Sequence, residues 1–532
     1  MGLRKKRIKV RFFSYIVPSA EKTVKEAIMD LITSLVSLYL SDRRKAIAKY
    51  ATSAREMQEK VLRSLVRRAA KTEWGKEHKY SEIKNYDDFA ANVPITSYDD
   101  LQERIERMRH GAKDVLWPGL VRYYAKSSGT TAGRSKYIPV TKVGLRRLHT
   151  MGGHDVTAMY LGRNKKSRLT TGHSLILTGG FDPELDTPTS RTGYVSSIMT
   201  STLPQFLRRI MKFGPPVEIA SIKDFGERRE KLAEYALKTK VTSISGVPSW
   251  WLSVLSRTME MAGKETMDEI WPDLEIFVHG GVAFTQYRDL YHKIITKPDM
   301  HYVETYNASE GFFGVQTDPA DPAMTLMVDY DVLYEFIPLS ELGNKEAKAV
   351  PVWEVEPGVN YAMVISTSCG LWRYLLGDTI RFTRKNPYRF MITGRTRQFI
   401  NAYGEEVILE NAEKGLEAAC KATGAKVLEY HAAPVYMDEH GKARHQWMVE
   451  FAEEPDSIEK FAAELDNGIR ACNSDYDDKR YEDIVLSRID LVKARKGLFH
   501  DWMAKHGKLG GQNKVPRLAN SRDIMDELLG MN

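Results

Sequence analysis

Apolar residues recur at helical spacing along the first hundred residues of the chain. In residues 21–50 they follow one another mostly at intervals of three or four, with polar and charged residues between them. They are Val24, Ile28, Leu31, Ile32 and Leu35. This period places the apolar side chains on one face of an α-helix. Residues 56–70 and 99–108 are predicted to be helical for the same reason, so the chain should begin with a layer of helices.

Farther along the chain, short apolar runs alternate with amphipathic stretches. The apolar runs predict strands, and the amphipathic stretches predict helices. The strands are expected at residues 173–180, 241–247, 274–281 and 301–307, and the helices at residues 142–161, 225–240, 250–262 and 286–295. This alternation predicts an α/β domain with a largely parallel sheet. Ligands of such sheets bind at the carboxyl ends of the strands.

Two further β segments are expected at residues 333–338 and 361–367, and the second leads into the segment at residues 371–382. Within that segment, the dipeptide Gly377-Asp378 is typical of a tight turn. The sequence therefore predicts that the carboxylate of Asp378 is exposed at a turn.

The pattern changes after Arg395. A strand pair around Gly404, a helix at residues 409–422 and strands at 427–437 and 445–451 are followed by a helix at 457–472, a strand at 484–492 and a helix at 497–506. This order predicts a small α+β domain of ordinary size. We therefore expect two domains, residues 1–394 and 395–532, and a glycine-rich, basic, mobile tail from residue 507.

Residues 127–136 (S-S-G-T-T-A-G-R-S-K) are almost all small, polar or cationic. Gly129 and Gly133 permit positive φ, so several backbone N–H groups can point toward one place. Hydroxyl and cationic side chains add further donors. These are Ser127, Ser128, Thr130, Thr131, Arg134, Ser135 and Lys136. Such a loop suits a polyphosphate, and the alternative is an ordinary hairpin turn of the same composition.

The loop is not a Walker motif, because G-x-x-x-x-G-K-[ST] is absent and no helix is predicted directly after the lysine. A P-loop nucleotide hydrolase is therefore not expected.

Charge and cysteine content limit the possible functions further. The chain has 532 residues and a net charge of +8, but residues 1–11 alone hold six Lys and Arg and no acid. The rest of the chain is nearly neutral, so nucleic-acid binding by the folded body is not expected. Three cysteines without C-x-x-C spacing suggest neither a disulfide framework nor a zinc site. No uncharged run is long enough to span a bilayer, and a cytoplasmic protein is expected.

Three segments in this order resemble the nucleotide-binding motifs of one enzyme family. They are S-S-G-T-T-A-G-R-S-K (residues 127–136), Y-N-A-S-E-G (306–311) and W-R-Y-L-L-G-D (372–378). The chain resembles the auxin-responsive acyl-acid amido synthetases (the Gretchen Hagen family), a branch of the adenylate-forming superfamily. The likeness runs over residues 74–518, and W-R-Y-x-x-G-D is nearer to the bacterial members than to the plant pattern.

The resemblance implies a two-step, ATP-dependent and Mg²⁺-dependent ligase. A carboxylic acid and ATP give an acyl-adenylate and pyrophosphate, and an amine, expected to be an amino acid, then displaces AMP. The resemblance also implies a large adenylate-forming domain with mixed, largely parallel sheets and a small mobile C-terminal domain that rotates between the two steps.

The resemblance assigns roles to residues of this chain. The loop, including Lys136, would hold the β and γ phosphates. The other roles would be Tyr306 on adenine, Ser309 on the α-phosphate, Glu310 on Mg²⁺, Asp378 and Arg395 on the ribose, Gly280 and Gly281 along the adenine pocket, and Lys514 on the α-phosphate. One carboxylate suffices for Mg²⁺, which keeps waters and phosphate ligands. A cation such as Lys514 would stabilise charge that develops during adenylation.

Two other functions remain open at this point. An acyl-CoA ligase would share the first step and use a thiol acceptor, and a non-catalytic regulator could bind nucleotide on the same fold. A basic arm at residues 1–11 that contacts nucleic acid is a third, weaker alternative. The acid is left open as well, although apolar residues in segments 145–160, 179–207 and 247–255 favour an aromatic or aliphatic one.

Overall fold

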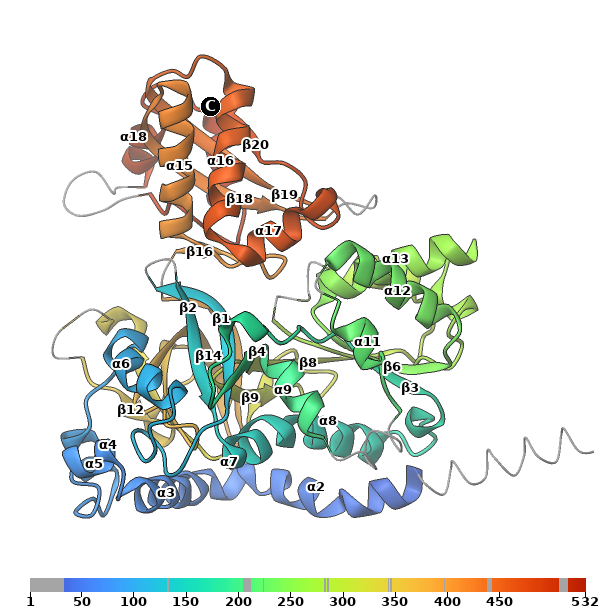
Figure 1. Ribbon diagram of the computed structural model, residues 1–532, viewed down its shortest axis with the longest axis vertical. Helices are drawn as coiled ribbons and strands as arrows, with labels where there is room; N and C mark the ends of the chain where they lie inside the picture. The colour runs from blue at the N-terminus through green and yellow to red at the C-terminus, as the bar shows by residue number, and fades with distance from the viewer. Residues whose placement is uncertain are drawn as a thin grey trace, which may run out of the picture.

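The computed structural model describes residues 33–131, 134–203, 212–222, 224–281, 284, 287–342, 344, 347–396, 398–437, 443–506 and 515–532. Its N-terminal domain is a layer of helices beneath a large sheet, and a small C-terminal domain lies above it (Figure 1). The predicted α/β fold class is confirmed.

The N-terminal helices form the base of the molecule (Figure 1). They are α2 (Ser41–Ala48), α3 (Tyr50–Ala69), α4 (Glu73–Glu77), α5 (Tyr86–Asn92) and α6 (Tyr98–Arg109). Helix α3 buries Ala54, Val61, Leu65 and Ala69, whose spacing of mostly four residues puts them on one face. The predicted helical layer is therefore present, although residues 21–32 of the first predicted helix lie outside the described residues.

The large sheet has, among the described residues, the strand order β12-β11-β13-β14-β15-β10-β9-β8-β7-β6-β3-β5. Strands β3 (His173–Ile176), β5 (Phe213–Gly214), β6 (Val241–Gly246), β7 (Ile276–His279) and β8 (His301–Ala308) pair in parallel. These strands match the four predicted ones, with β5 added at the edge.

The other strands of the sheet are antiparallel. They are β9 (Gly311–Val315), β10 (Met324–Leu326), β11 (Val332–Pro338), β12 (Val350–Pro351), β13 (Asn360–Thr367), β14 (Tyr374–Lys385) and β15 (Tyr388–Arg395). Their core is rich in apolar side chains from the sheet and from the N-terminal helices. This packing fixes the edge of the sheet on which the functional residues lie.

Helices connect the parallel strands. The chain runs through α7 (Lys142–Gly144), the π-helical η1 (Leu145–His149) and α8 (Thr150–Arg163), and later through α9 (Val195–Thr202), α11 (Val217–Ala220), α12 (Phe225–Leu237), α13 (Pro248–Ala262) and α14 (Arg288–Ile294). The four predicted helices of this region are all present.

A separate three-stranded sheet holds the segment that was predicted to be a loop. It has the order β2-β1-β4, with β1 (Tyr123–Thr131), β2 (Arg134–Val140) and β4 (Arg191–Gly193). Strands β1 and β2 stay paired up to Thr131 and Arg134, with an irregularity between Ser127 and Thr130. The loop boundaries at residues 127 and 136 were therefore wrong, because hydroxyl-bearing residues also fit a β ladder.

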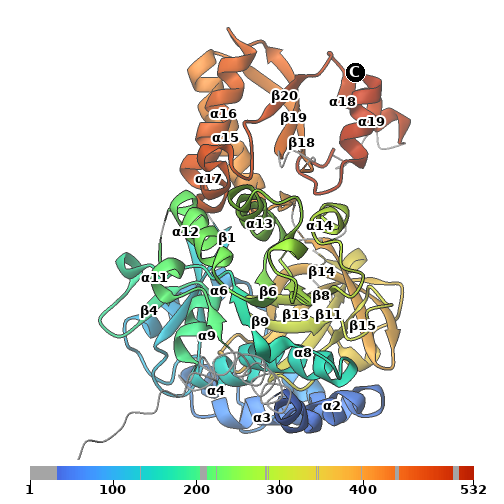
Figure 2. The ribbon, with the colours of Figure 1, turned by 90° about the vertical axis from the view of Figure 1, so that its right-hand side faces the viewer.

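The C-terminal domain has its own sheets. Strands β16 (Phe399–Ile400) and β17 (Val407–Ile408) form a short pair, and β18 (Lys426–Val435), β19 (Arg444–Glu453) and β20 (Asp490–Lys493) form a three-stranded sheet. Helices α15 (Leu409–Thr423) and α16 (Ile458–Cys472) lie on one side of it, and α18 (Leu498–Lys505) and α19 (Asp523–Met531) on the other (Figure 2).

Two helices of this domain were not predicted. Helix α17 (Ser474–Arg480) follows α16 at the face toward the N-terminal domain, and α19 ends the chain. Met525 and Leu528 anchor α19 in the core of the domain. The predicted mobile tail is thus wrong for the last residues, and residues 507–514 lie outside the described ones.

Candidate active site

The predicted nucleotide-binding residues come from separate strands and meet at one place. Tyr306 lies on β8, Glu310 follows it before β9, and Asp378 and Arg395 face one another across β14 and β15. The Tyr306 hydroxyl donates a hydrogen bond to Oδ2 of Asp378. Three strands separate β8 from β14 in the sheet, so the sheet must curl for these side chains to touch. Curling is what assembles the site.

Asp378 lies inside strand β14 and only 9% of the residue is exposed. The prediction of an exposed tight turn is therefore wrong. Gly377 does adopt a positive φ of 97°, which bends the strand without ending it, and the pairing with Arg395 continues the ladder. A carboxylate on a paired strand is held more rigidly than one at a turn, and a rigid position suits ligand binding.

Arg395 is shared between two carboxylates. Its Nε donates to Oδ1 of Asp378 at 2.9 Å, and its Nη2 lies 3.4 Å from Oε1 of Glu406. The guanidinium also lies 5.0 Å from the centroid of the Phe399 ring. Burial lowers the pKa of Arg395, but Glu406 and Asp378 raise it by more, so the net shift is upward. The arginine is a fixed cation at the edge of the site.

Glu310 is a buried carboxylate, 6% exposed, beside this cluster. Burial raises its pKa to about 6, the positive charge of Lys136 opposes that rise, and Asp378 adds to it. Lys136 of β2 is therefore near enough to act electrostatically on Glu310. A carboxylate that the fold itself does not neutralise is suited to a metal ion that arrives with a phosphate-bearing ligand.

The Glu310 carboxylate suits magnesium as a single protein ligand. Among the described residues no group of three or more His, Cys, Asp and Glu side chains could hold a metal ion. Magnesium does not need such a cage, since one or two carboxylates, phosphate oxygens and waters complete its shell. Glu310 would then be its protein ligand.

Only part of the predicted phosphate loop can be placed. Lys136 Nζ lies 5.7 Å from the centroid of the Tyr98 ring, and Ser127 pairs with Lys136 across the ladder. Ser128, Gly129, Thr130 and Thr131 lie on β1, but their side chains lie outside the described part of the structure, as do Gly133 and Lys514 as a whole. Their predicted roles stay predictions.

The remaining predicted residues lie near the site. Ser309 directly precedes Glu310, and its hydroxyl donates to the Lys126 carbonyl at 3.5 Å. Gly280 follows β7, and a Cβ there would lie 2.4 Å from the Thr305 carbonyl oxygen. Gly281 has a φ of 87°, which favours glycine. Gly280 therefore lets the turn approach β8 closely, at the residue before Tyr306.

Three residues beside the predicted ones were not predicted from the sequence. Tyr374, the first residue of β14, is buried; its hydroxyl has no hydrogen-bond partner among the described residues, and burial and the nearby Glu310 raise its pKa. His279 ends β7, and burial lowers its pKa to about 3, which keeps the ring neutral. Glu406 reaches the site from the C-terminal domain. Tyr374 is part of W-R-Y-L-L-G-D, so the motif itself was the available signal.

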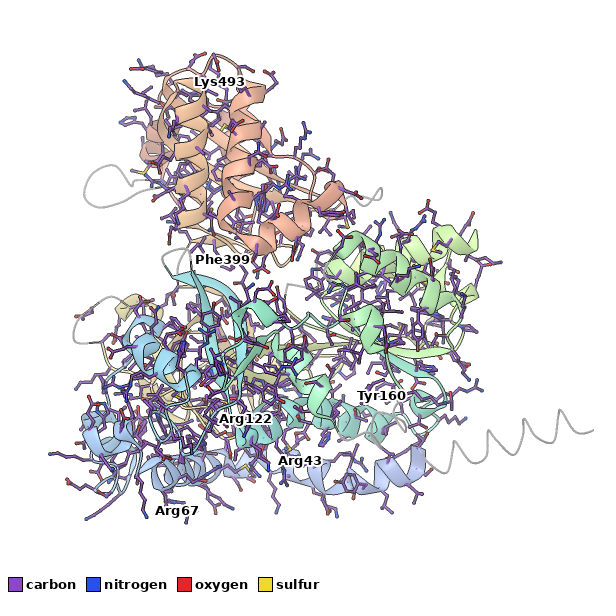
Figure 3. All side chains as sticks on the ribbon, viewed as in Figure 1. Arg43, Arg67, Arg122, Tyr160, Phe399 and Lys493 are labelled. Carbon is purple, nitrogen blue, oxygen red and sulfur yellow. The ribbon has the colours of Figure 1, made fainter. Side chains whose placement is uncertain are left out.

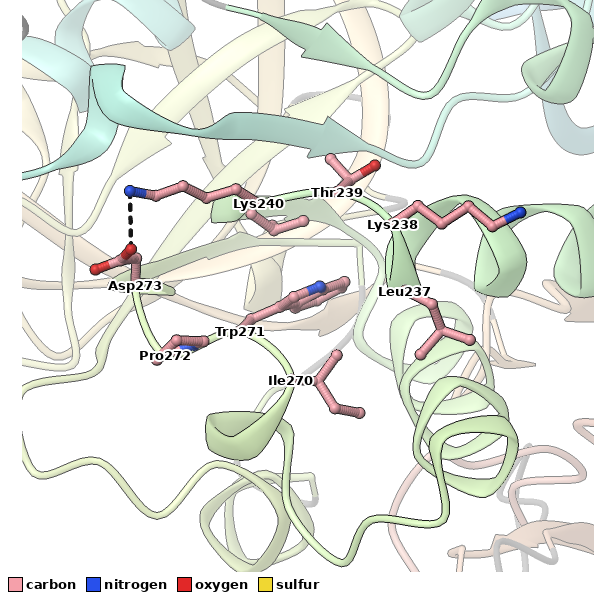
Figure 4. Close-up of a pocket in the computed structure, with 9 residues that line it drawn as sticks. Leu237, Lys238, Thr239, Lys240, Ile270, Trp271, Pro272 and Asp273 are labelled. Carbon is pink, nitrogen blue, oxygen red and sulfur yellow. Dashed lines mark ion pairs between the residues drawn. The ribbon is translucent and has the colours of Figure 1, made fainter. Parts of the chain in front are cut away.

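Two surface cavities lie away from this place. One, of about 330 Å³, is lined by residues of the α12 C-terminus and the loop around Trp271, where Lys240 pairs with Asp273 at 2.9 Å (Figure 4). It lies at the amino end of β6, whereas Gly280 and Gly281 follow the carboxyl end of β7. The other, of about 430 Å³, lies beside α2 and α8. The site is therefore identified by its side chains and not by a cavity.

No helix among the described residues is long and apolar enough to cross a membrane.

Comparison with protein families gives a consistent result along the chain. The GH3 family N-terminal domain matches residues 43–225, the GH3 family central domain residues 325–395, and the GH3 family C-terminal domain residues 410–523. Together these matches span more than half of the chain.

Individual relatives are similar over nearly their whole length. Indole-3-acetic acid-amido synthetase GH3.4 of Arabidopsis thaliana is 22% identical over 90% of this chain and 92% of its own. Indole-3-acetic acid-amido synthetase GH3.8 of Oryza sativa subsp. indica is 23% identical, with 92% of each chain covered.

Solved structures show the same fold. AtGH3.15 acyl acid amido synthetase in complex with 2,4-DB has a TM-score of 0.58 at 17% identity, with 91% of this chain and 95% of that chain covered. A 2-hydroxyisobutyryl-CoA ligase has a TM-score of 0.54 at 14% identity, with 92% and 93% covered.

Proposed function

The chain belongs to the GH3 family, and on that premise we propose that it is an ATP-dependent acyl acid amido synthetase. In the first step, a carboxylate oxygen of the acid attacks the α-phosphorus of ATP, and the bond to the β-phosphate breaks to release pyrophosphate. In the second step, an amine nitrogen attacks the acyl carbon, loses a proton, and AMP leaves. The amine is proposed to be an amino acid, and the acid an aromatic or aliphatic one.

One observation carries this proposal. Tyr306, Asp378 and Arg395 come from three strands and form one hydrogen-bonded cluster, and the charges of Lys136, Asp378 and Arg395 all act on Glu310. A fixed carboxylate suits a pair of ribose hydroxyls, and an aromatic ring suits a base. A cationic hairpin opposite a metal-binding carboxylate suits the phosphates between them. Magnesium, when bound there by Glu310, would neutralise charge on the phosphate oxygens.

Each of these residues would then contact a different part of the nucleotide. Asp378 and Arg395 would orient the ribose, Tyr306 and the Gly280-Gly281 turn would hold the adenine, and Ser309 would bind the α-phosphate. The hairpin of β1 and β2 would hold the β and γ phosphates and the leaving pyrophosphate.

We also propose that the C-terminal domain turns about a hinge next to Arg395 and delivers Lys514 to the α-phosphate for the first step. Losing such a cation costs about 10² to 10³ in rate. Lys514→Ala is therefore expected to slow acyl-adenylate formation by about that factor and to leave the reaction of supplied acyl-adenylate with the amine unchanged. Equal damage to both steps would contradict this role.

The three cysteines Cys369, Cys420 and Cys472 are all free, which is compatible with the reducing cytoplasm that we propose as the compartment.

The decisive experiment is pyrophosphate release across a panel of carboxylic acids, with and without each amino acid, and with coenzyme A in parallel. We expect acid-dependent release in the presence of Mg²⁺ and an amide product with an amino acid. A thioester in place of the amide would identify an acyl-CoA ligase. No acid-dependent release from any acid, with normal ATP binding, would support a non-catalytic nucleotide-binding protein.

A further inference from the structure

A short loop joins β16 to β17 at the junction of the two domains. Phe399, the first residue of β16, lies where the C-terminal domain meets the N-terminal one (Figure 3). The loop contains Glu406, whose carboxylate is 16% exposed and contacts Arg395 at 3.4 Å. This contact reaches from the C-terminal domain to the cluster that holds Asp378.

The backbone of this loop is held mainly by the C-terminal domain. His445 Nε2 lies 2.9 Å from Oε1 of Glu405, and both side chains are fully buried. Asn473 Nδ2 donates to the carbonyl oxygens of Glu405 and Glu406 at 3.0 and 3.2 Å. Asn520 Oδ1 accepts from the Asn401 N–H at 2.7 Å. These contacts come from β19, the N-terminus of α17 and the segment before α19, so Glu406 moves with its domain.

Glu406 is also held in an uncommon backbone conformation. Its φ is 39°, in the left-handed region that non-glycine residues rarely adopt. Such a conformation persists only where surrounding contacts enforce it, and here the carbonyl bond to Asn473 does so. The strained backbone aims the carboxylate at the N-terminal domain.

At the other end of the contact, Arg395 belongs to the large sheet. It is the last residue of β15 and its partner Asp378 lies directly opposite on β14. A single guanidinium therefore serves one carboxylate of the sheet and one of the C-terminal domain. On the C-terminal side, burial raises the pKa of Asp475 of α17 to about 6, the cation Lys479 of the same helix opposes that rise, and the charge of Glu406 adds to it.

We propose that Glu406 is a positioning residue that shares Arg395 with Asp378 and so makes nucleotide affinity depend on the position of the C-terminal domain. In this structure, the ion pair with Glu406 partly neutralises Arg395 and so weakens its interaction with the ribose site. Rotation of the domain would carry Glu406 away and leave Arg395 to Asp378 and the nucleotide. This inference rests on the proposed function, because it takes the Asp378 cluster as the nucleotide site.

The test compares three variants of the full chain by the dissociation constant for AMP, measured by titration calorimetry at fixed salt. Glu406→Gln keeps the size of the side chain and removes its charge, and it should tighten AMP binding roughly three- to tenfold. Glu406→Asp keeps the charge and should bind AMP as the wild type does. Glu410→Gln removes a carboxylate that pairs with Lys414, on α15 of the same domain, and should change nothing.

A second readout separates positioning from a structural role. The KM for ATP in acid-dependent pyrophosphate release should fall with Glu406→Gln, while the rate of the reaction between supplied acyl-adenylate and amine stays within about twofold. The melting temperatures of all three variants should match that of the wild type.

The outcomes are distinct. Unchanged AMP affinity in Glu406→Gln, or equal effects of Glu406→Gln and Glu406→Asp, would overturn the inference and leave the proposed function standing. If Glu406→Gln does not fold, the Glu406→Asp variant decides, since a changed AMP affinity with the charge kept contradicts the inference. Failure of the wild-type chain to bind AMP at all would contradict the nucleotide site and the proposed function together.

Discussion

Two arginine–carboxylate pairs lie on the same large sheet and differ in how completely the protein satisfies them. Arg373, just before β14, contacts Glu335 of β11 at 2.9 Å, and the two side chains are 7% and 0% exposed. Arg395, at the end of β15, contacts Asp378 at the same distance, with exposures of 29% and 12%. The motif W-R-Y-L-L-G-D contains Arg373 of the first pair and Asp378 of the second. These two residues nevertheless have different roles.

The partners of Arg373 are all internal. Its Nη1 donates to the carbonyl oxygens of Ala90 and Val93 at 3.0 and 2.8 Å, and the Tyr86 hydroxyl donates to Glu335 at 2.9 Å. These contacts fasten the end of α5 to the sheet. A buried ion pair of this kind is costly to break on one side only, so Arg373 holds the fold.

The partners of Arg395 are divided between domains. Asp378 belongs to the sheet, Glu406 to the C-terminal domain, and the guanidinium remains partly exposed. The difference between the pairs shows that identical chemistry serves structure where every group is satisfied internally, and serves a ligand where a group remains available at a domain boundary.

The largest expected effect is on catalysis. Asp378→Asn keeps the shape of the side chain and removes the charge that holds the ribose and Arg395. We expect acid-dependent pyrophosphate release to fall by at least about 10³-fold, as for loss of a group required for positioning the reactants. The free energy of unfolding should change by less than about 1 kcal/mol.

The matched control for this variant is Glu356→Gln, which removes an exposed carboxylate paired with Lys385 at the far end of β14. It should keep wild-type activity. Undiminished adenylation in Asp378→Asn would remove Asp378 from the site and abolish the contrast with Arg373.

The next effect is on stability. Arg373→Ala leaves Glu335 buried without its cation, and we expect the free energy of unfolding to fall by about 3–5 kcal/mol, measured by urea denaturation. Activity of the remaining folded protein at low temperature should stay near the wild-type value. Arg107→Ala, which breaks an exposed pair with Glu73 at 2.8 Å, should cost at most about 1 kcal/mol. Equal losses in the two variants would show that Arg373 has no special structural role.

The sequence predicted most of the α/β alternation and the family, because periodicity and three motifs are local properties of the chain. Through the resemblance it also named Tyr306, Asp378 and Arg395, which the structure brings into one hydrogen-bonded cluster; their roles stay predictions. It placed Asp378 at a turn, however, because Gly377-Asp378 is typical of turns, whereas Arg395 on the neighbouring strand extends the ladder past Gly377. Pairing with a distant strand is not visible in a local pattern.

Other features depended on contacts that no local pattern contains. The hydrogen bond from the Tyr306 hydroxyl to Asp378 forms because the sheet curls. The contact between Glu406 and Arg395 follows from the placement of a whole domain. Helix α19 is short, and its apolar face becomes evident only against the core that it covers. The predicted domain boundary, the bacterial type and the roles of the residues outside the described part stay predictions.

A smaller effect concerns the stability cost of Glu310. Its pKa of about 6 lies above the ordinary value of 4.5 because burial disfavours the charge. The folded state therefore binds the proton more tightly than the unfolded state. The ionised carboxylate lowers the free energy of unfolding, and this loss is absent below about pH 4.5 and complete above about pH 6. We expect Glu310→Gln, without nucleotide or Mg²⁺, to be more stable than the wild type by about 2 kcal/mol at pH 7.5 and equal to it at pH 4.

Glu310 thus differs from Arg373, because its ionised carboxylate lowers the free energy of unfolding, whereas Arg373 raises it. Urea denaturation at the two pH values provides the measurement. A wild type that is more stable than Glu310→Gln at pH 7.5 would mean that Glu310, like Glu335, is satisfied by the fold and is not held available for a metal ion.

The smallest effect is the pH dependence of the first step. Only the ionised form of Glu310 can bind Mg²⁺, so kcat/KM for pyrophosphate release should fall about tenfold for each pH unit below the pKa of about 6. Because the metal binds the deprotonated carboxylate, raising Mg²⁺ tenfold should move the midpoint of this acidic limb to lower pH. Glu356→Gln should keep the same profile, since its carboxylate lies outside the site. An acidic limb that does not respond to Mg²⁺ would assign the titration to another group, and Glu310 would then join Glu335 as a carboxylate of the fold.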